Sequence, residues 1–188
     1  MGHQRRFQRY SDEDRRSWQN PEAILGLTGL KSGDVFVDVG CGYGFFAIPA
    51  ARIVGPHGKV IGIDVDRDWL ESLRVAATNE GITNVETLLG RAEEIVPLEG
   101  FADVVFLGMD LHDFDDPAAV LRNARRTLKG GGTLANLDWK KEESPIGPPP
   151  EIRLDAATEA AMISDEGFEV ISSTAQGPYH YLILARPR

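Results

Sequence analysis

The sequence predicts an α/β fold: a doubly wound, seven-stranded, mostly parallel sheet with an antiparallel C-terminal strand. Three observations predict this fold. Short apolar runs alternate with helical patterns along the chain, as they do in βαβ units. The first run, residues 35–39, is apolar at nearly every position, which is typical of a strand buried on both faces of a parallel sheet. The last two runs are separated by a short connection at Gly177 and Pro178, as in an antiparallel pair.

The first half of the chain starts with a polar, charged segment, residues 1–20, which we expect to be flexible. A short helix follows, because Asn20 is a typical N-terminal cap and Pro21 is favoured in the first turn. Gly81 marks the end of a longer helix, since glycine readily adopts the left-handed conformation of a C-terminal cap. The expected elements are a helix over 21–27, a strand over 35–39, a helix over 45–54, a strand over 60–65, a helix over 68–80 and a strand over 84–89.

The second half continues the alternation and ends in the antiparallel pair. The expected elements are a strand over 102–107, a helix over 117–128, a strand over 133–138, a helix over 151–166 and strands over 168–173 and 179–185. The glycines at 130–132 are expected to separate the helix over 117–128 from the strand that follows. Residues 139–150 form a long connection, and loops of this length in compact domains are usually functional or disordered. Its prolines at 148–150 favour a stiff segment, so we predict that this loop forms a wall of a substrate pocket. The alternative is that residues 147–150 only lead the chain to the C-terminal helix.

Length predicts a single domain over residues 21–188, with residues 1–20 as a candidate lid. Tyr10 and Trp18 are the residues of that segment expected to cover a ligand. The net charge of −9 argues against nucleic acid binding, which needs a basic surface. The single cysteine, Cys41, excludes an internal disulfide, and the sequence has neither an apolar run long enough for a membrane helix nor a secretory signal. We therefore expect a cytoplasmic protein without membrane insertion.

A glycine-rich loop follows the first predicted strand and precedes a helix. It has the sequence DVGCGYG over residues 38–44. Alternate glycines allow a tight turn and let a ligand approach the main chain, where the following helix presents free N–H groups. The spacing is G-x-G-x-G, whereas a dinucleotide-binding loop needs G-x-G-x-x-G, and Phe45 stands at the third glycine position. A nicotinamide cofactor is therefore disfavoured.

Asp64 ends the second predicted strand, 20 residues after Gly44. A carboxylate at this position can accept hydrogen bonds from both hydroxyls of an adenosine ribose. Taken alone, Asp64 is equally well explained as a solvated residue at the end of a strand. Together with the glycine loop, it predicts a ligand that contains adenosine.

Five segments carry a resemblance to a known family. They are VFVDVGCGYG (35–44), VIGIDVD (60–66), GRAEE (90–94), ADVVFLGMDLHDF (102–114) and GGGTLANLDW (130–139). Over nearly all of residues 20–188 the chain resembles the class I S-adenosylmethionine-dependent methyltransferases. It is similar to the small, stand-alone prokaryotic type in the ubiquinone and menaquinone methyltransferase group. The resemblance implies a Rossmann-like fold and S-adenosyl-L-methionine as cofactor.

The resemblance also implies roles for residues at matching positions. The glycine loop would hold the methionine part of the cofactor, Asp64 would take the ribose hydroxyls, and Val65 would lie against the adenine. Family members commonly carry Asp just before the Ala92 position, whereas this chain has Arg91, which has only donors. Glu93 or a backbone carbonyl would then accept from the adenine amino group. The implied cofactor-binding residues are Asp38, Gly40, Gly42, Gly44, Asp64, Val65, Ala92, Glu93 and Gly108.

His112 is the candidate catalytic residue. It follows the fourth predicted strand, at the carboxyl edge where open α/β sheets bind ligands, and histidine can act as a base towards a hydroxyl or an acidic carbon. A surface histidine in an acidic turn is the alternative. Trp139 and Lys140 are candidates for the substrate pocket, with core packing and a solvated charge as alternatives. The histidines and Cys41 have no metal-ligand spacing, so we expect no metal site.

The leading expectation is a methyltransferase that acts on a small molecule. Two alternatives remain: a protein or RNA methyltransferase that uses the basic stretch at residues 5–16, and a non-catalytic cofactor-binding subunit of the same fold. A homodimer is a candidate assembly.

Overall fold

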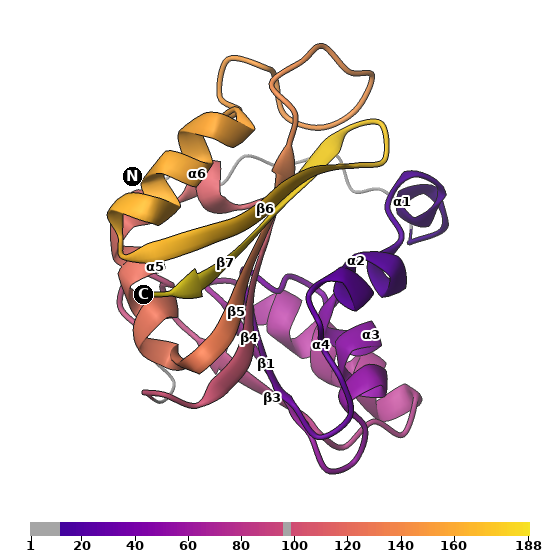
Figure 1. Ribbon diagram of the computed structural model, residues 1–188. Helices are drawn as coiled ribbons and strands as arrows, with labels where there is room; N and C mark the ends of the chain where they lie inside the picture. The colour runs from indigo at the N-terminus through magenta and orange to yellow at the C-terminus, as the bar shows by residue number, and fades with distance from the viewer. Residues whose placement is uncertain (1–11, 96–98) are drawn as a thin grey trace.

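The computed structural model describes residues 12–95 and 99–188, and one seven-stranded sheet forms its centre (Figure 1). The strand order is β3-β2-β1-β4-β5-β7-β6, and β7 runs antiparallel to its neighbours while the other pairings that involve β1 to β5 are parallel. The strands are β1 (Val35–Val39), β2 (Lys59–Asp64), β3 (Val85–Leu89), β4 (Ala102–Gly108), β5 (Leu128–Trp139), β6 (Phe168–Gln176) and β7 (His180–Pro187). The predicted fold class is confirmed.

Helices cover both faces of the sheet, with α2, α3 and α4 on one face and α5 and α6 on the other (Figure 1). The helices are α1 (Asp12–Trp18), α2 (Pro21–Leu27), α3 (Ala47–Val54), α4 (Arg67–Asn79), α5 (Pro117–Thr127) and α6 (Ala156–Asp165), with a short 3₁₀ helix η1 (Leu111–Asp113). Successive side chains of a strand point to opposite faces, so Phe36 packs in the core beneath α2 to α4 and Val37 in the core beneath α5 and α6. Two apolar cores therefore explain why β1 is apolar at successive positions.

Local signals explain the helix ends that were predicted well. The side chain of Asn20 accepts a hydrogen bond from the N–H of Ala23 at 3.0 Å, and α2 has the predicted bounds. The bounds of α3, α4 and α5 lie within one or two residues of the prediction.

The start of β5 differs from the prediction. The strand begins at Leu128, so the glycines at 130–132 lie inside it and do not separate it from α5. A Cβ atom on Gly132 would lie 3.0 Å from the backbone oxygen of Ala102, beside a shift of register in β4. Gly132 therefore allows β5 to approach β4 closely, which local sequence signals do not reveal.

The start of α6 also differs. The helix begins at Ala156 because the side chain of Asp155 accepts from the N–H of Thr158 at 2.9 Å and caps it there. Residues 151–155 extend the preceding connection by several residues.

Candidate active site

The carboxyl ends of four adjacent parallel strands bring polar residues to one edge of the sheet. Asp38 lies in β1 and the glycine loop follows that strand. Asp64 ends β2, Asp110 and His112 follow β4, and Asp138 lies near the end of β5. In open α/β sheets this edge is where ligands bind. The sequence-predicted Asp38, Asp64 and His112 are therefore brought to a common edge, and the structure adds Asp110 and Asp138.

Asp64 holds the glycine loop in place. Its Oδ2 accepts the N–H of Gly42 at 2.8 Å, and its Oδ1 accepts the N–H of Asp66 at 2.9 Å. The backbone oxygen of Ile63 accepts from Gly40 and Cys41, at 2.9 and 3.0 Å. A carboxylate oxygen can accept a second hydrogen bond, so these contacts leave capacity for a ribose. Burial raises the pKa of Asp64.

The three glycines of the loop have different reasons to be glycine, although each has a positive φ, of 71°, 52° and 98° in order. A Cβ atom on Gly40 would lie 2.3 Å from the Oδ2 of Asp110, and one on Gly44 would lie 2.5 Å from the Cδ1 of Leu73 in α4. A Cβ atom on Gly42 would meet no atom within 4 Å. The structure therefore accounts for Gly40 and Gly44 by packing within the protein, and leaves space for a ligand beside Gly42.

Two buried carboxyl groups beside the loop each have an oxygen without a partner. Asp38 is 2% exposed, and neither its Oδ2 nor that of Asp110 has a hydrogen bond among the described residues. Burial raises the pKa of Asp38 to about 8, and burial together with the charge of Asp64 raises that of Asp110. Such groups fit a cationic ligand, and S-adenosylmethionine carries two positive groups, an ammonium and a sulfonium.

The residues implied for the adenine lie next to this loop. Val65 is 56% exposed at the rim, and the side-chain amide of Asn123 donates to the backbone oxygens of Ala92 and Glu93 at 3.0 and 2.7 Å. Arg91 pairs with Glu93 at 3.1 Å and with Asp115 at 2.8 Å. Glu93 and Asp115 thus hold the side chain of Arg91, the residue that stands where family members commonly carry Asp. The hydrogen bonds of Asn123, a residue that sequence reasoning missed, fix the turn at Ala92 and Glu93.

Helix α1 lies beside the loop. The guanidinium of Arg15 lies 3.8 Å from the centre of the Phe45 ring and donates to the hydroxyl of Tyr43 at 3.4 Å. The side chain of Gln19 lies 3.1 Å from the sulfur of Met109, which directly follows β4 and has a φ of 72°. The described part of the N-terminal segment is therefore a helix and a connection that contact both loops of the site. Tyr10 lies outside the described residues.

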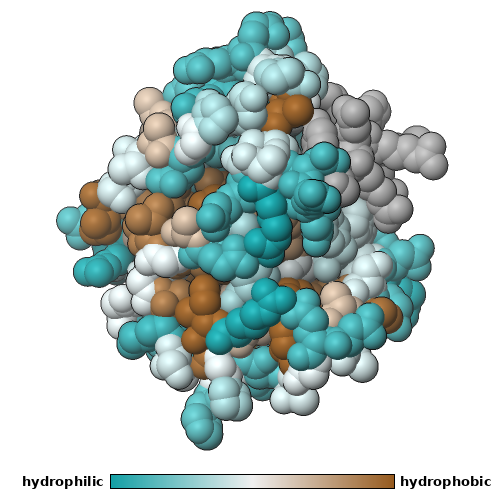
Figure 2. All heavy atoms as spheres, turned by 90° about the vertical axis from the view of Figure 1, so that its right-hand side faces the viewer, coloured by the Kyte–Doolittle hydropathy of each residue, from teal (hydrophilic) through white to brown (hydrophobic). Residues whose placement is uncertain are grey.

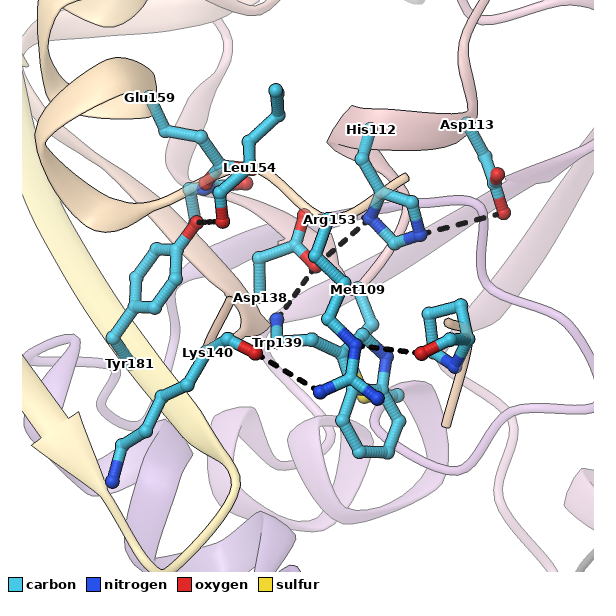
Figure 3. Close-up of polar contacts among 12 residues, drawn as sticks. Met109, His112, Asp113, Asp138, Trp139, Lys140, Arg153, Leu154, Glu159 and Tyr181 are labelled. Carbon is cyan, nitrogen blue, oxygen red and sulfur yellow. Dashed lines mark hydrogen bonds and ion pairs between the residues drawn. The ribbon is translucent and has the colours of Figure 1, made fainter. Parts of the chain in front are cut away.

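Trp139 is 5% exposed and belongs to an aromatic cluster. Its ring centre lies 5.7 Å from that of Trp18 and 4.3 Å from that of His180, and the guanidinium carbon of Arg153 lies 5.2 Å from it. The ammonium of Lys140 donates to the backbone oxygens of Gly177 and Pro178 at 3.3 and 3.1 Å. The structure thus does not bring Lys140 together with His112; the two side chains point apart (Figure 3).

Arg153 organises the connection after β5. It is 2% exposed and donates to the backbone oxygens of Lys140, Glu142, Ile146 and Pro148 and to the hydroxyl of Ser144, at distances from 2.7 to 3.1 Å. A Cβ atom on Gly147 would lie 2.7 Å from the ring of Trp139. This loop is therefore held from within by one arginine, a contact that the sequence pattern did not indicate.

His112 is joined to Asp138 across β4 and β5 (Figure 3). Its Nδ1 lies 2.9 and 3.0 Å from the two carboxylate oxygens of Asp138. Burial lowers the pKa of His112, but the charge and hydrogen bond of Asp138 outweigh it, so the net pKa is raised. Sequence reasoning selected His112 and missed Asp138, because a histidine in η1 and an aspartate in β5 share no local motif.

In residues 12–95 and 99–188, the structure offers neither a membrane-spanning helix nor a metal-binding cluster. The helices of the described residues include none that is both long and apolar enough to cross a membrane. No three histidine, cysteine, aspartate or glutamate side chains of those residues form a group that could hold a metal ion.

Hydrophilic and hydrophobic residues are interspersed on the face that carries α1 and α2 (Figure 2).

Comparison with known proteins places the chain in a family. Residues 30–176 match the family described as methyltransferase domain. A demethylmenaquinone methyltransferase of Listeria monocytogenes is 34% identical over 121 residues, which are 64% of this chain and 51% of that protein. A ubiquinone/menaquinone biosynthesis C-methyltransferase of Francisella philomiragia is 30% identical over 132 residues, 70% of this chain and 52% of that protein. The chain spans about half the length of these curated relatives.

Solved structures agree with this assignment. A SAM dependent methyltransferase from Aquifex aeolicus has a TM-score of 0.87 and 29% identity, covering 94% of this chain and 98% of that one. The [4+2]-cyclase SpnF has a TM-score of 0.76 at 19% identity, covering 89% of this chain and 79% of that one, and shows a likeness of fold alone. The chain belongs to the methyltransferase domain family, and by sequence and fold it is similar to the class I S-adenosylmethionine-dependent methyltransferases of the ubiquinone and menaquinone group.

Proposed function

We propose that this chain transfers the methyl group of S-adenosylmethionine to a small molecule. One observation carries the proposal: Asp38 has a buried carboxyl oxygen without a partner, next to a glycine loop that leaves space beside Gly42. When bound, the cofactor supplies a methyl group on a positively charged sulfur. The protein's part is to orient the two reactants and exclude water, which is most of what methyl transfer requires.

The cofactor would be held along the edge from β4 to β2. Asp38 and the loop of Gly40, Gly42 and Gly44 would hold the methionine part, with Gly108 near its amino-acid end. In this arrangement Gly42 is the glycine that the ligand approaches, whereas Gly40 and Gly44 shape the loop.

The adenosine part would lie towards β2 and β3. Asp64 would accept from the ribose, Val65 would cover the adenine, and the turn at Ala92 and Glu93 would face its edge. Because Glu93 already pairs with Arg91, a backbone oxygen is the better candidate acceptor for the adenine amino group.

The substrate side would be bounded by α1 and by the loop over residues 140–153. The hydrogen bonds of the buried Arg153 support a wall that exists before the substrate binds, which reduces the entropy lost on binding. Trp139 would support that wall from beneath, and residues 1–20 would act as a lid through α1. The names of the curated relatives favour a quinone-like acceptor, but the chain spans about half of their length, so we assign only a small molecule.

The experiment is a transfer assay with S-adenosylmethionine that carries a tritiated methyl group. The full chain is incubated with separate small-molecule, protein and RNA fractions of a cell extract. The proposal predicts label in the small-molecule fraction and none above background in the other two. Label in protein or RNA alone would contradict the small-molecule assignment, and label in no fraction would favour a non-catalytic subunit.

A further inference from the structure

The His112–Asp138 pair is buried at the edge where the reactants would meet. The side chains of both residues are 1% exposed. The Nδ1 of His112 faces the carboxylate of Asp138 at 2.9 Å, and the Oδ1 of Asp138 also accepts the N–H of Trp139 at 2.7 Å. On the other side of the ring, the Nε2 of His112 is buried and has no hydrogen bond among the described residues. The nearest acid to it is Asp113, at 3.7 Å.

We infer that His112 is a general base that removes a proton from the methyl acceptor through Nε2, and that Asp138 is the positioning residue that holds it. The inference rests on the proposed function and deepens it. It makes the acceptor a small molecule with a weakly acidic hydroxyl, such as a phenol, a hydroquinone or an enol.

The position of Asp138 decides which nitrogen of His112 is free. A carboxylate at Nδ1 keeps the proton of the neutral imidazole on that nitrogen, which leaves the lone pair on Nε2. Glu159 lies next to Asp138, and burial, followed by the charge of Asp138, raises the pKa of Glu159 to about 10. Glu159 is therefore neutral near pH 7, so the negative charge beside His112 comes from Asp138 and Asp113. Arg153 is the charged group that opposes them.

The pair also lies next to the position proposed for the cofactor. Asp110 stands two residues before His112, and its carboxyl group contacts the position where a Cβ atom of Gly40 would be. The charges of Asp64 and Asp138 both raise the pKa of Asp110. The carboxyl groups at the ends of β2 and β5 are therefore close enough to Asp110 to interact with it electrostatically. A base at this point would face an acceptor bound beside the methionine part.

The proposed step conserves atoms and charge. The hydroxyl proton of the acceptor passes to Nε2 of His112, and the electron pair of the O–H bond stays on the acceptor. That pair, at oxygen or at the adjacent ring carbon, forms a bond to the methyl carbon. The carbon–sulfur bond breaks and leaves its electrons on sulfur. The products are the methylated acceptor, neutral S-adenosylhomocysteine and an imidazolium, which then loses its proton to water; after transfer to carbon, the ring carbon also loses its proton to water.

The test compares the variants His112→Gln and Asp138→Asn with wild type and with the control His57→Gln. His57 is exposed in the turn between α3 and β2, far along the chain from this pair. Binding of S-adenosylhomocysteine is measured by calorimetry, and methyl transfer is measured with hydroquinone, catechol and butylamine as acceptors. We expect each variant to bind S-adenosylhomocysteine within a few-fold of wild type. His112→Gln should lose about 10² to 10⁴ of the rate with hydroquinone or catechol, the range for general base catalysis.

The pH profile separates a positioning role from a structural one. Because a general base acts only when unprotonated, the rate should fall as the pH drops through the raised pKa of His112. Asp138→Asn should move that fall to lower pH and slow the reaction, whereas His57→Gln should do neither. Histidine nitrogen NMR on the protein without acceptor should show the neutral His112 ring protonated at Nδ1 in wild type.

Three results would overturn the inference. The first is transfer to butylamine but to neither phenol. The second is a wild-type rate with phenols in His112→Gln. The third is a neutral ring protonated at Nε2. If the wild-type protein does not bind S-adenosylhomocysteine, the proposed function is contradicted. A failure of the inference about His112 can therefore be distinguished from a failure of the proposed function.

Discussion

The carboxylate of Asp64 accepts the N–H of Gly42, 22 residues earlier in the chain, at 2.8 Å. Asp64 is thus part of the support for the glycine loop as well as a candidate ribose ligand. Its two roles predict that a change at Asp64 affects both the loop and the cofactor.

Asp64→Ala is expected to weaken S-adenosylhomocysteine binding at least tenfold. The variant loses hydrogen bonds from a charged acceptor to the ribose, each worth about 1.5–3 kcal/mol, and it also releases the N–H of Gly42. Titration calorimetry gives the affinity, and circular dichroism checks the fold. The control is Asp165→Asn, at the exposed end of α6, which should bind as wild type does. Equal affinities for Asp64→Ala and wild type would remove Asp64 from the site.

Gly42→Val is expected to abolish cofactor binding in a protein that still folds, because its side chain would occupy the space left for the ligand. Its positive φ adds about 1–2 kcal/mol of strain. Gly29→Val is the matched control, since Gly29 also has a positive φ and open space but lies away from the site. The control should lose similar stability and keep its affinity. Retained binding by Gly42→Val would mean that the ligand does not approach this glycine.

Gly44→Ala is expected to act on stability. Its Cβ atom would lie 2.5 Å from Leu73, which is fully buried, so the free energy of unfolding should fall by about 1–3 kcal/mol. Denaturant unfolding measures this change. A Gly44→Ala protein as stable as wild type, but unable to bind S-adenosylhomocysteine, would contradict the packing explanation.

The raised pKa of Asp38 predicts that both the stability of the protein and its affinity for S-adenosylmethionine depend on pH. This pKa rises from the ordinary 3.8 of an aspartate to about 8 in the folded protein, so the folded state binds more protons than the unfolded state over that range. This group's contribution to the free energy of unfolding therefore falls as pH rises from about 4 to 8. A cation beside Asp38 favours the carboxylate, so S-adenosylmethionine should bind more tightly as pH rises over the same range and should release a proton. Calorimetry in buffers of different ionisation enthalpy counts the protons, and Asp38→Asn should release fewer. Proton release unchanged in Asp38→Asn would be inconsistent with this role.

Arg153→Ala should loosen the loop over residues 140–148. The variant loses five hydrogen bonds that are buried or partly buried, and we expect a loss of stability of at least roughly 2 kcal/mol. Hydrogen exchange should become faster in that loop and stay slow in β1 and β4. In wild type, S-adenosylhomocysteine or a bound acceptor should slow exchange in residues 139–150. Protection confined to residues 38–66 would identify the loop as a spacer.

Most of the fold could be predicted because its elements depend on residues that are close together in the sequence. The cap at Asn20, the apolar run of β1 and the glycine loop each depend on neighbours in sequence. The start of β5 was missed because Gly132 packs against the backbone of β4, a contact between distant residues. The start of α6 was missed because Asp155 caps the helix several residues after the expected start.

The site was predicted in part for the same reason. Family motifs mark Asp38 and Asp64, but Asp138 gains its role only from His112 on the neighbouring strand end. Arg153 likewise donates to backbone carbonyl groups of the loop that precedes it. Because every residue has a carbonyl group, the pattern of side chains in the sequence does not indicate these contacts. Long-range contacts of this kind need the folded structure.

The most direct measurement of the central claim is calorimetric titration of the full chain with S-adenosylhomocysteine and, separately, with NAD. The account predicts saturable binding of S-adenosylhomocysteine to one site per chain, abolished in Gly42→Val and kept in Gly29→Val, and no binding of NAD. No binding of S-adenosylhomocysteine to a folded wild-type chain, or binding that Gly42→Val leaves unchanged, would contradict it.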